Sequence, residues 1–203
     1  NNDGTMMFVA GIDEDKVHEY TLTTGFDVST ASFVDSLDIS SQENHSADLA
    51  FNNDGTKMFV VGRAGDDVNL YTLTTGFDVS TASFVDSFDV SNEETAPAGL
   101  AFNNDGTKMF VLGRSGRDVT EYTLTTGFDV SSASVVDSFS VSTQEDDPAG
   151  LAFNNDGTKM FVAGIDEDKV HEYTLTTGFD VSTASSVDDF SVVSQDGAAT
   201  SLE

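Results

Sequence analysis

Apolar and polar positions between residues 98 and 142 form four short segments, each with its own pattern. Residues 98–102 are short and apolar, residues 108–112 are apolar on consecutive positions, and residues 119–126 are rich in β-branched and aromatic side chains. Consecutive apolar positions indicate a strand that is buried on both faces. Residues 135–141 alternate between apolar and polar, which is typical of a half-exposed strand. The pattern therefore predicts four antiparallel β-strands with a polar outer edge.

A tight-turn phrase shows that this unit is repeated along the chain. Asn-Asn-Asp-Gly-Thr, in which Asn, Asp and Gly tolerate positive φ, starts every 51 residues, at Asn1, Asn52, Asn103 and Asn154. The repeats are residues 1–51, 52–102, 103–153 and 154–203. Inner strands that are buried on both faces must lie between neighbouring units, which favours a β-propeller. We predict an all-β domain over residues 1–203, with four four-stranded antiparallel blades.

The end of the chain repeats the start of a unit, since residues 199–203 align with residues 97–101. We expect this spare first strand to complete the first blade and to close the ring. Closure within one chain gives four blades, whereas closure between two chains gives an eight-bladed homodimer with twofold symmetry. A fragment of a longer array is a third alternative. We favour self-association into the eight-bladed homodimer.

The chain is strongly acidic, with 36 acidic and 8 basic residues and a formal net charge of -28. Such a surface repels phosphate backbones and anionic lipids, so we expect neither nucleic acid nor a membrane as partner. The acidic residues are dispersed, which fits a solubility-enhancing or salt-adapted surface, a divalent-cation binder or a cationic partner. Cysteine is absent from the sequence, so disulfides and thiolate metal sites are excluded.

The repeat resembles a known family. Residues 148–162 read PAGLAFNNDGTKMFV, which is similar to the repeats of YVTN-type, lactonase-like β-propellers. The segment TLTTGFDVSTAS resembles tandem propeller repeats of uncharacterised marine bacterial and phage proteins. This resemblance implies propeller architecture and a structural or binding role, and it brings no active-site motif. The compartment stays open, with an extracellular or virion-associated location preferred.

Two sets of loops differ in how much they vary between repeats. The first and third loops of each unit are nearly identical in all copies, whereas the second loops and the connectors between units differ. Binding residues usually lie on loops that a rigid scaffold positions, so the diverse loops are the candidate surface for a protein or carbohydrate ligand. Drift in unconstrained turns is the alternative. The candidate binding residues are Asp13, Glu14, Asp15, Arg63, Asp66, Asp67, Arg114, Arg117, Asp166, Glu167 and Asp168.

No catalytic residues are predicted, since three histidines, no cysteine and no recurring Ser-His pair provide no nucleophile machinery. His18 and His171 are expected at an exposed strand position. The repeated methionines at positions 7, 58, 109 and 160 are expected to fill the core. We therefore favour a non-catalytic scaffold or binding module without a cofactor.

Two alternatives involve a metal. A lactonase-like hydrolase needs metal ligands at the central channel, where the matching first-strand positions carry Asp48, Gly99, Gly150 and Ser201, a poor ligand set. A calcium-stabilised propeller would use the aspartates of the NNDG turns, which have too few neighbouring oxygen ligands for a typical calcium loop.

Overall fold

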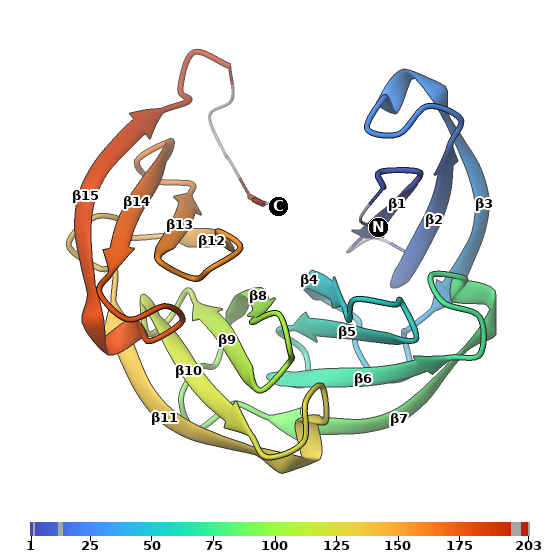
Figure 1. Ribbon diagram of the computed structural model, residues 1–203, viewed down its shortest axis with the longest axis horizontal. Coiled ribbons are helices and arrows are strands. Elements are labelled where there is room, and N and C mark those ends of the chain that lie inside the picture. The colour runs from blue at the N-terminus through green and yellow to red at the C-terminus, as the bar shows by residue number, and fades with distance from the viewer. Residues whose placement is uncertain (2, 12–13, 196–199, 203) are drawn as a thin grey trace.

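The computed structural model describes residues 1, 3–11, 14–195 and 200–202 and shows four antiparallel sheets around one central axis (Figure 1). The described helices are four single 3-10 turns of three residues each, so none of them is long enough to span a membrane. This arrangement confirms the predicted all-β propeller with four blades.

Each sheet is one blade, and its strands follow one another from the axis outward (Figure 1). Blade 1 contains β1 (Met6–Gly11), β2 (Lys16–Leu22) and β3 (Ala31–Asp38). Blade 2 contains β4 (Ser46–Phe51), β5 (Lys57–Gly62), β6 (Asp67–Leu73) and β7 (Ala82–Asp89). Blade 3 contains β8 (Pro97–Phe102), β9 (Lys108–Gly113), β10 (Asp118–Leu124) and β11 (Ala133–Ser140). Blade 4 contains β12 (Pro148–Phe153), β13 (Lys159–Gly164), β14 (Lys169–Leu175) and β15 (Ala184–Ser191).

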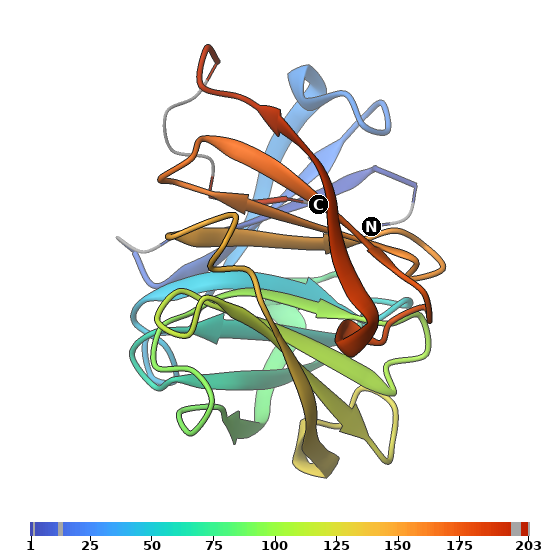
Figure 2. The same ribbon diagram turned by 90° about the vertical axis from the view of Figure 1, so that its left-hand side faces the viewer.

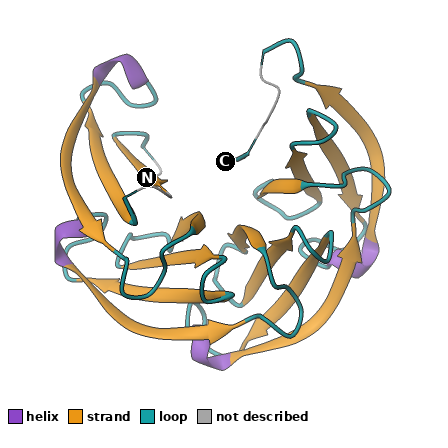
Figure 3. Cartoon of the chain, turned by 180° about the vertical axis from the view of Figure 1, so that it is seen from behind, coloured by secondary structure: helices purple, strands orange, loops and turns teal. Residues whose placement is uncertain are grey.

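A 3-10 helix precedes the outer strand of each blade and lies at the rim of the molecule (Figure 3). These helices are η1 (Val28–Thr30), η2 (Val79–Thr81), η3 (Val130–Ser132) and η4 (Val181–Thr183). An aspartate caps each helix, as Asp78 does by accepting a hydrogen bond from the Ser80 amide. The conserved phrase GFDVS thus has a local cause, because its Asp and Ser close this turn.

The second strand of blades 2 and 3 is apolar on consecutive positions because both of its faces are covered. On β5, Met58 and Val60 face blade 1 and pack in a cluster with Val17. Phe59 and Val61 face the opposite way and join the cluster shared with blade 3. The prediction of a strand buried on both faces is confirmed for β5.

The hydrophobic core is divided into three clusters, one at each junction between neighbouring blades. This division follows from the architecture, because a thin sheet buries its apolar faces only against the next sheet. Every blade also carries a register shift between its two outermost strands. Such bulges increase twist, and Figure 2 shows the strands of blade 4 turning progressively from β12 to β15.

Blade 1 differs from the expectation for a closed ring, because its sheet has three described strands and β1 pairs only with β2. Residues 199 and 203 of the spare strand lie outside the described residues. Ser201 and Leu202 lie beside Gly150 of β12 and are not in a strand. In Figure 1, blades 1 and 4 are separated on the side where the chain ends.

Candidate functional site

The loops form two sets on opposite faces of the molecule, and hydrogen bonds link the loops within each set. The third loop bonds to the first, as in Phe77 N–H to Gly55 O at 3.0 Å, and together these loops form the uniform face. The second loop bonds to the preceding connector, as in Arg63 N–H to His45 O at 3.1 Å. We call this second set the variable face. It comprises the second loops, 12–16, 63–67, 114–118 and 165–169, and the connectors, 40–48, 91–99, 142–150 and 193–201.

Four candidate residues of the variable face have a structural role in their turn. They occupy one repeat position with φ between 50° and 54°, namely Asp15, Asp66, Arg117 and Asp168. The carbonyl of each accepts the N–H of the residue that leaves the outer strand, as in Val90 N–H to Asp66 O at 2.9 Å. A non-glycine residue in this conformation is uncommon, and Asp is among the residues that tolerate it, so turn geometry explains these aspartates without a ligand.

Buried connector carboxylates hold the second loops in place, and sequence reasoning did not identify them. Glu94 is 2% exposed and accepts hydrogen bonds from the amides of Ala96 at 2.6 Å, Ser115 at 3.2 Å and Gly116 at 2.7 Å. Glu43 and Glu145 repeat this arrangement in the neighbouring connectors. The sequence carries a signal for these carboxylates, since all four connectors have an acidic residue at this repeat position. The fourth of them is Asp196, which lies outside the described residues.

The other acidic candidates are dispersed over separate blades and do not converge. Glu14 lies 3.7 Å from both Lys16 and His18, and Glu167 lies 3.7 Å from Lys169. The side chains of Glu14 and Glu167 are mainly exposed. Salt bridges of this kind contribute little to stability.

Two further acidic candidates bond within the variable face. Asp67 accepts a hydrogen bond from Asn69 at 2.7 Å, and burial raises the pKa of its carboxyl. The Asp166 amide donates to Glu145 at 3.3 Å. Asp13 lies outside the described residues.

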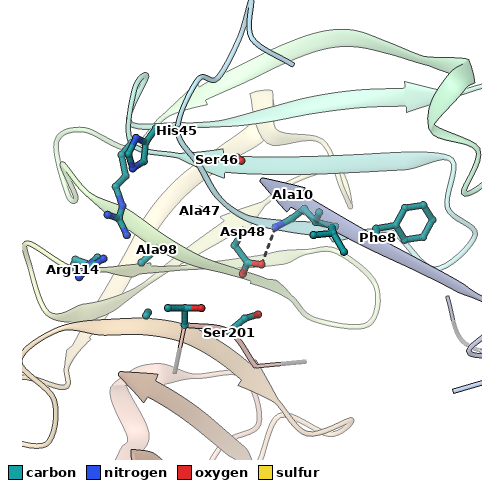
Figure 4. A pocket seen from close by; sticks show the side chains of 14 residues that line it. Phe8, Ala10, His45, Ser46, Ala47, Asp48, Ala98, Arg114 and Ser201 are labelled. Atoms are coloured by element: carbon teal, nitrogen blue, oxygen red, sulfur yellow. Dashed lines mark hydrogen bonds between the residues drawn. The ribbon is translucent and has the colours of Figure 1, made fainter. Parts of the chain in front are cut away.

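Arg63 and Arg114, by contrast, line a single cavity of about 420 Å³ on the axis. The inner strands of the four blades and residues 200 and 201 form the rest of its wall. Figure 4 shows the His45 and Arg114 side chains at one end of this cavity and the Asp48 carboxylate further in. The volume is within the range of small-molecule sites.

The two arginines differ in how their charge is compensated. The Arg114 guanidinium forms an ion pair with Asp147 of the next connector. The connector beside Arg63 has Ala96 at the repeat position where the connector beside Arg114 has Asp147. Arg63 Nε is buried and has no hydrogen-bond partner among the described residues. Burial and the charge of Arg114 both lower the pKa of Arg63, whereas Asp147 raises it.

Asp48, an acidic residue that lines the axial cavity (Figure 4), is hydrogen-bonded to the backbone. Its carboxylate accepts the Leu49 amide at 2.8 Å and the Leu100 amide of blade 3 at 2.8 Å. The bond to Leu100 ties the neighbouring inner strands β4 and β8 together. Asp48 therefore connects blades 2 and 3.

The predicted exposed position of the histidines is wrong. His171 is 3% exposed, and His18 is half-buried. His171 packs beneath the variable face, 3.8 Å from Glu145 Oε2, and burial lowers the pKa of its imidazole. The prediction that methionines fill the core is confirmed for Met58, Met109 and Met160, which are fully buried.

The residues that the metal alternatives require do not form a suitable donor set. Within the described part of the chain no three His, Asp or Glu side chains are close enough to share a metal ion. In the NNDG turn, Asp105 Oδ1 accepts both the amide, at 3.0 Å, and the hydroxyl, at 2.6 Å, of Thr107. These bonds lower the pKa of Asp105. The same pattern at Asp3, Asp54 and Asp156 explains the aspartate by the turn itself.

Comparisons with known proteins support the fold. No protein-family model and no curated protein matches the sequence. The chain is similar in structure to a putative 6-phosphogluconolactonase from Bacteroides uniformis, with a TM-score of 0.63 and 13% identity over 94% of this chain and 52% of the other. It is also similar to the periplasmic gluconolactonase of Pseudomonas aeruginosa, with a TM-score of 0.56 and 18% identity over 93% of this chain and 50% of the other.

A third similar structure is the β-propeller domain of Myceliophteria thermophila Cps50 (Swd1), with a TM-score of 0.55 and 12% identity. This match covers 93% of the chain and 56% of the other structure. The chain thus spans about half the length of the structures it matches. At these identities the likeness shows the β-propeller fold.

Proposed function

We propose that this protein is a non-catalytic binding module that takes a small ligand with a carboxylate or phosphate group, such as an acidic sugar. The anionic group would bind between Arg63 and Arg114 in the axial cavity, and the loops of the variable face would form the rim. Arginine suits this role because its planar guanidinium donates two parallel hydrogen bonds to such groups.

The observation that carries this proposal is the uncompensated Arg63. Arg63 and Arg114 share one neighbouring carboxylate, Asp147, and the Asp48 carboxylate further into the cavity is bonded to two backbone amides. A buried polar atom without a partner is costly, and a bound anion would supply the missing acceptor for Arg63 Nε.

Calorimetric titration with gluconate, 6-phosphogluconate and inorganic phosphate at low salt tests the proposal. We expect Arg63→Ala to weaken binding of the best of these probes at least about tenfold, since a charged hydrogen bond contributes roughly 1.5–3 kcal/mol. Arg117→Ala is the matched control, because Arg117 is exposed and pairs with Asp146 outside the cavity. Equal losses in both variants, or no binding of any probe, would refute the arginine site.

Lactone hydrolysis is the second candidate, favoured by the likeness to the gluconolactonase and by His45 at the cavity. It ranks lower because Asp48 is bonded to two amides and the described residues present no metal cluster. A pH-stat assay with glucono-1,5-lactone tests it, and we expect no rate above the uncatalysed reaction. Catalysis that His45→Ala abolishes would replace the binding proposal with an enzyme.

Calcium stabilisation is the third candidate. Because each NNDG aspartate is bonded to its own turn, we expect the same melting temperature in calcium and in chelator.

A further inference from the structure

The outward face of blade 1 exposes residues that are buried in every other blade. Val28 is 71% exposed, whereas Val79, Val130 and Val181 at the same repeat position are fully buried. Val9 on β1 is 43% exposed, although its counterparts on β5, β9 and β13 are buried. The sequence of blade 1 is therefore that of an interior blade, while its face has no neighbour among the described residues.

A glycine on blade 1 also lacks, among the described residues, the neighbour that its counterparts in the other blades have. At Gly62, Gly113 and Gly164, an added Cβ would overlap with the buried connector glutamate of the preceding blade. At Gly11, the equivalent position, an added Cβ would meet no atom of the described residues within 4 Å. Blade 1 thus has the same glycine as the other blades, but no described connector carboxylate packs beside it.

The outward face of blade 4 exposes the opposite half of the interface. Phe88 and Phe139 on the outer strands pack edge-to-face on Tyr122 and Tyr173 of the next blade, each with ring centroids 5.5 Å apart. Phe190 occupies the same position on β15 and is 70% exposed. Tyr20 of blade 1 is the tyrosine that matches it.

A polar contact between blades is incomplete in the same way. Glu19 and Glu121 each accept the amide at the start of the 3-10 helix of the next blade, from Val79 at 2.9 Å and Val181 at 3.0 Å. Glu172 is their counterpart in blade 4, and its described partner is Lys159. The amide that would complete the pattern belongs to Val28.

From these four observations we infer that a second copy of this chain covers both faces and completes an eight-bladed ring. Blade 4 of each copy packs on blade 1 of the other, and each junction reproduces the contacts between blades 3 and 4. Phe190 packs on Tyr20 of the partner, and Glu172 accepts the Val28 amide. A head-to-tail contact used twice around one axis closes into a dimer.

The chain end fits this arrangement. Leu202 lies against Gly150 as Leu151 lies against Gly99, so residues 200–202 stand beside β12 where the first strand of a following blade would stand. In the repeat, Leu202 corresponds to Leu100, which pairs with Val111 of β9. Leu202 would therefore pair with Val9 on the open edge of the partner's β1.

A further point favours a copy of the same chain as the occupant. The exposed faces of blades 1 and 4 are the two halves of one repeated interface, so a copy presents the complementary surface. The ring would place Arg63 and Arg114 of both copies around one axis, so the partner would contribute to the cavity.

Light scattering on a sizing column tests this inference on the 203-residue chain. We expect twice the chain mass of 21.5 kDa for the native protein and for Val136→Asp, a control on the exposed outer strand β11. Val28→Asp and Phe190→Asp should each be folded monomers at the same concentration, as circular dichroism checks. A native mass of one chain, or of more than two, would overturn the inference.

Mixing the two variants provides a second readout. In a dimer of one Val28→Asp chain and one Phe190→Asp chain, the unchanged blade 4 of the first packs on the unchanged blade 1 of the second. An equimolar mixture should therefore recover dimers that neither variant forms alone. Failure of the mixture to form more dimer than the separate variants would overturn the head-to-tail arrangement, even if the native chain is dimeric.

Discussion

The junction between blades 2 and 3 and the open faces of blades 1 and 4 carry nearly the same residues in different surroundings. At the junction, Phe88 packs on Tyr122 and Val130 is fully buried. At the open faces, Phe190 and Val28 are exposed. The difference shows that no blade has a core of its own, because burial in this fold is created between units.

The largest expected effect is a difference in the free energy of unfolding between two aspartate substitutions, at Val130 and Val28, which occupy the same repeat position. Val130→Asp places a charge in the junction of blades 2 and 3, where it has no partner, so we expect a loss of about 4 kcal/mol or more in the free energy of unfolding. Val28→Asp should leave a folded monomer with a cooperative unfolding transition. Urea denaturation followed by circular dichroism measures both.

Equal destabilisation by the two aspartates would show that the face of blade 1 is buried within its own chain. That result would favour closure into four blades.

A smaller effect is expected at the glycines of the second strands. Gly113→Ala brings a methyl group into the space of the Glu94 carboxylate, whose hydrogen bonds restrict its movement. We expect a loss of about 1–3 kcal/mol. Gly11→Ala meets no atom within 4 Å in the described part of the chain, so the free energy of unfolding of the dilute monomer should change by less than about 0.5 kcal/mol.

Gly11→Ala should instead weaken dimer formation, which sedimentation at several concentrations measures. An unchanged dimer in Gly11→Ala would contradict the proposed entry of a connector carboxylate beside this glycine.

The smallest effect concerns pH. Burial raises the pKa of Asp67, Asp118 and Glu19 in the folded chain. The folded state then binds more protons than the unfolded state over the interval between the two pKa values, so stability decreases as pH rises through it. We expect the melting temperature to increase by a few degrees as pH falls from about 7 toward about 4, the ordinary pKa of these carboxyls.

Below about pH 4 the trend should reverse. Hydrogen bonds to threonine lower the pKa of Asp54 and Asp105, so their stabilisation is present above the unfolded pKa and lost as pH falls through the folded value. Asp118→Asn should flatten the increase in melting temperature that accompanies the fall in pH from neutral. A melting temperature that falls steadily from pH 7 to 4 would contradict these assignments.

The strands, the turns and the repeat boundaries could be predicted from sequence because each has a local cause. Consecutive apolar residues such as Met58 and Phe59 require two covered faces, and the NNDG phrase closes a turn through its own side chains. These determinants lie within a few residues of one another, so a single repeat contains them.

The site was less predictable because its contacts join residues from different blades. Glu94 lies in a variable connector, and its role becomes visible only when it meets Ser115 and Gly116 of the next blade. Arg63 was a candidate because its loop varies, but its missing partner depends on Ala96 in another connector. His171 was expected on the surface, and the packing of the connector above it buries the ring.

A disulfide between the two open edges tests the shared ring most directly. The chain has no cysteine, and paired strand residues have Cα atoms about 4.5–5.5 Å apart, within reach of a disulfide. Val9→Cys combined with Leu202→Cys, oxidised and then denatured without reductant, should give a covalent dimer by mass spectrometry. A disulfide within single chains of 21.5 kDa, or two free thiols, would contradict the eight-bladed ring.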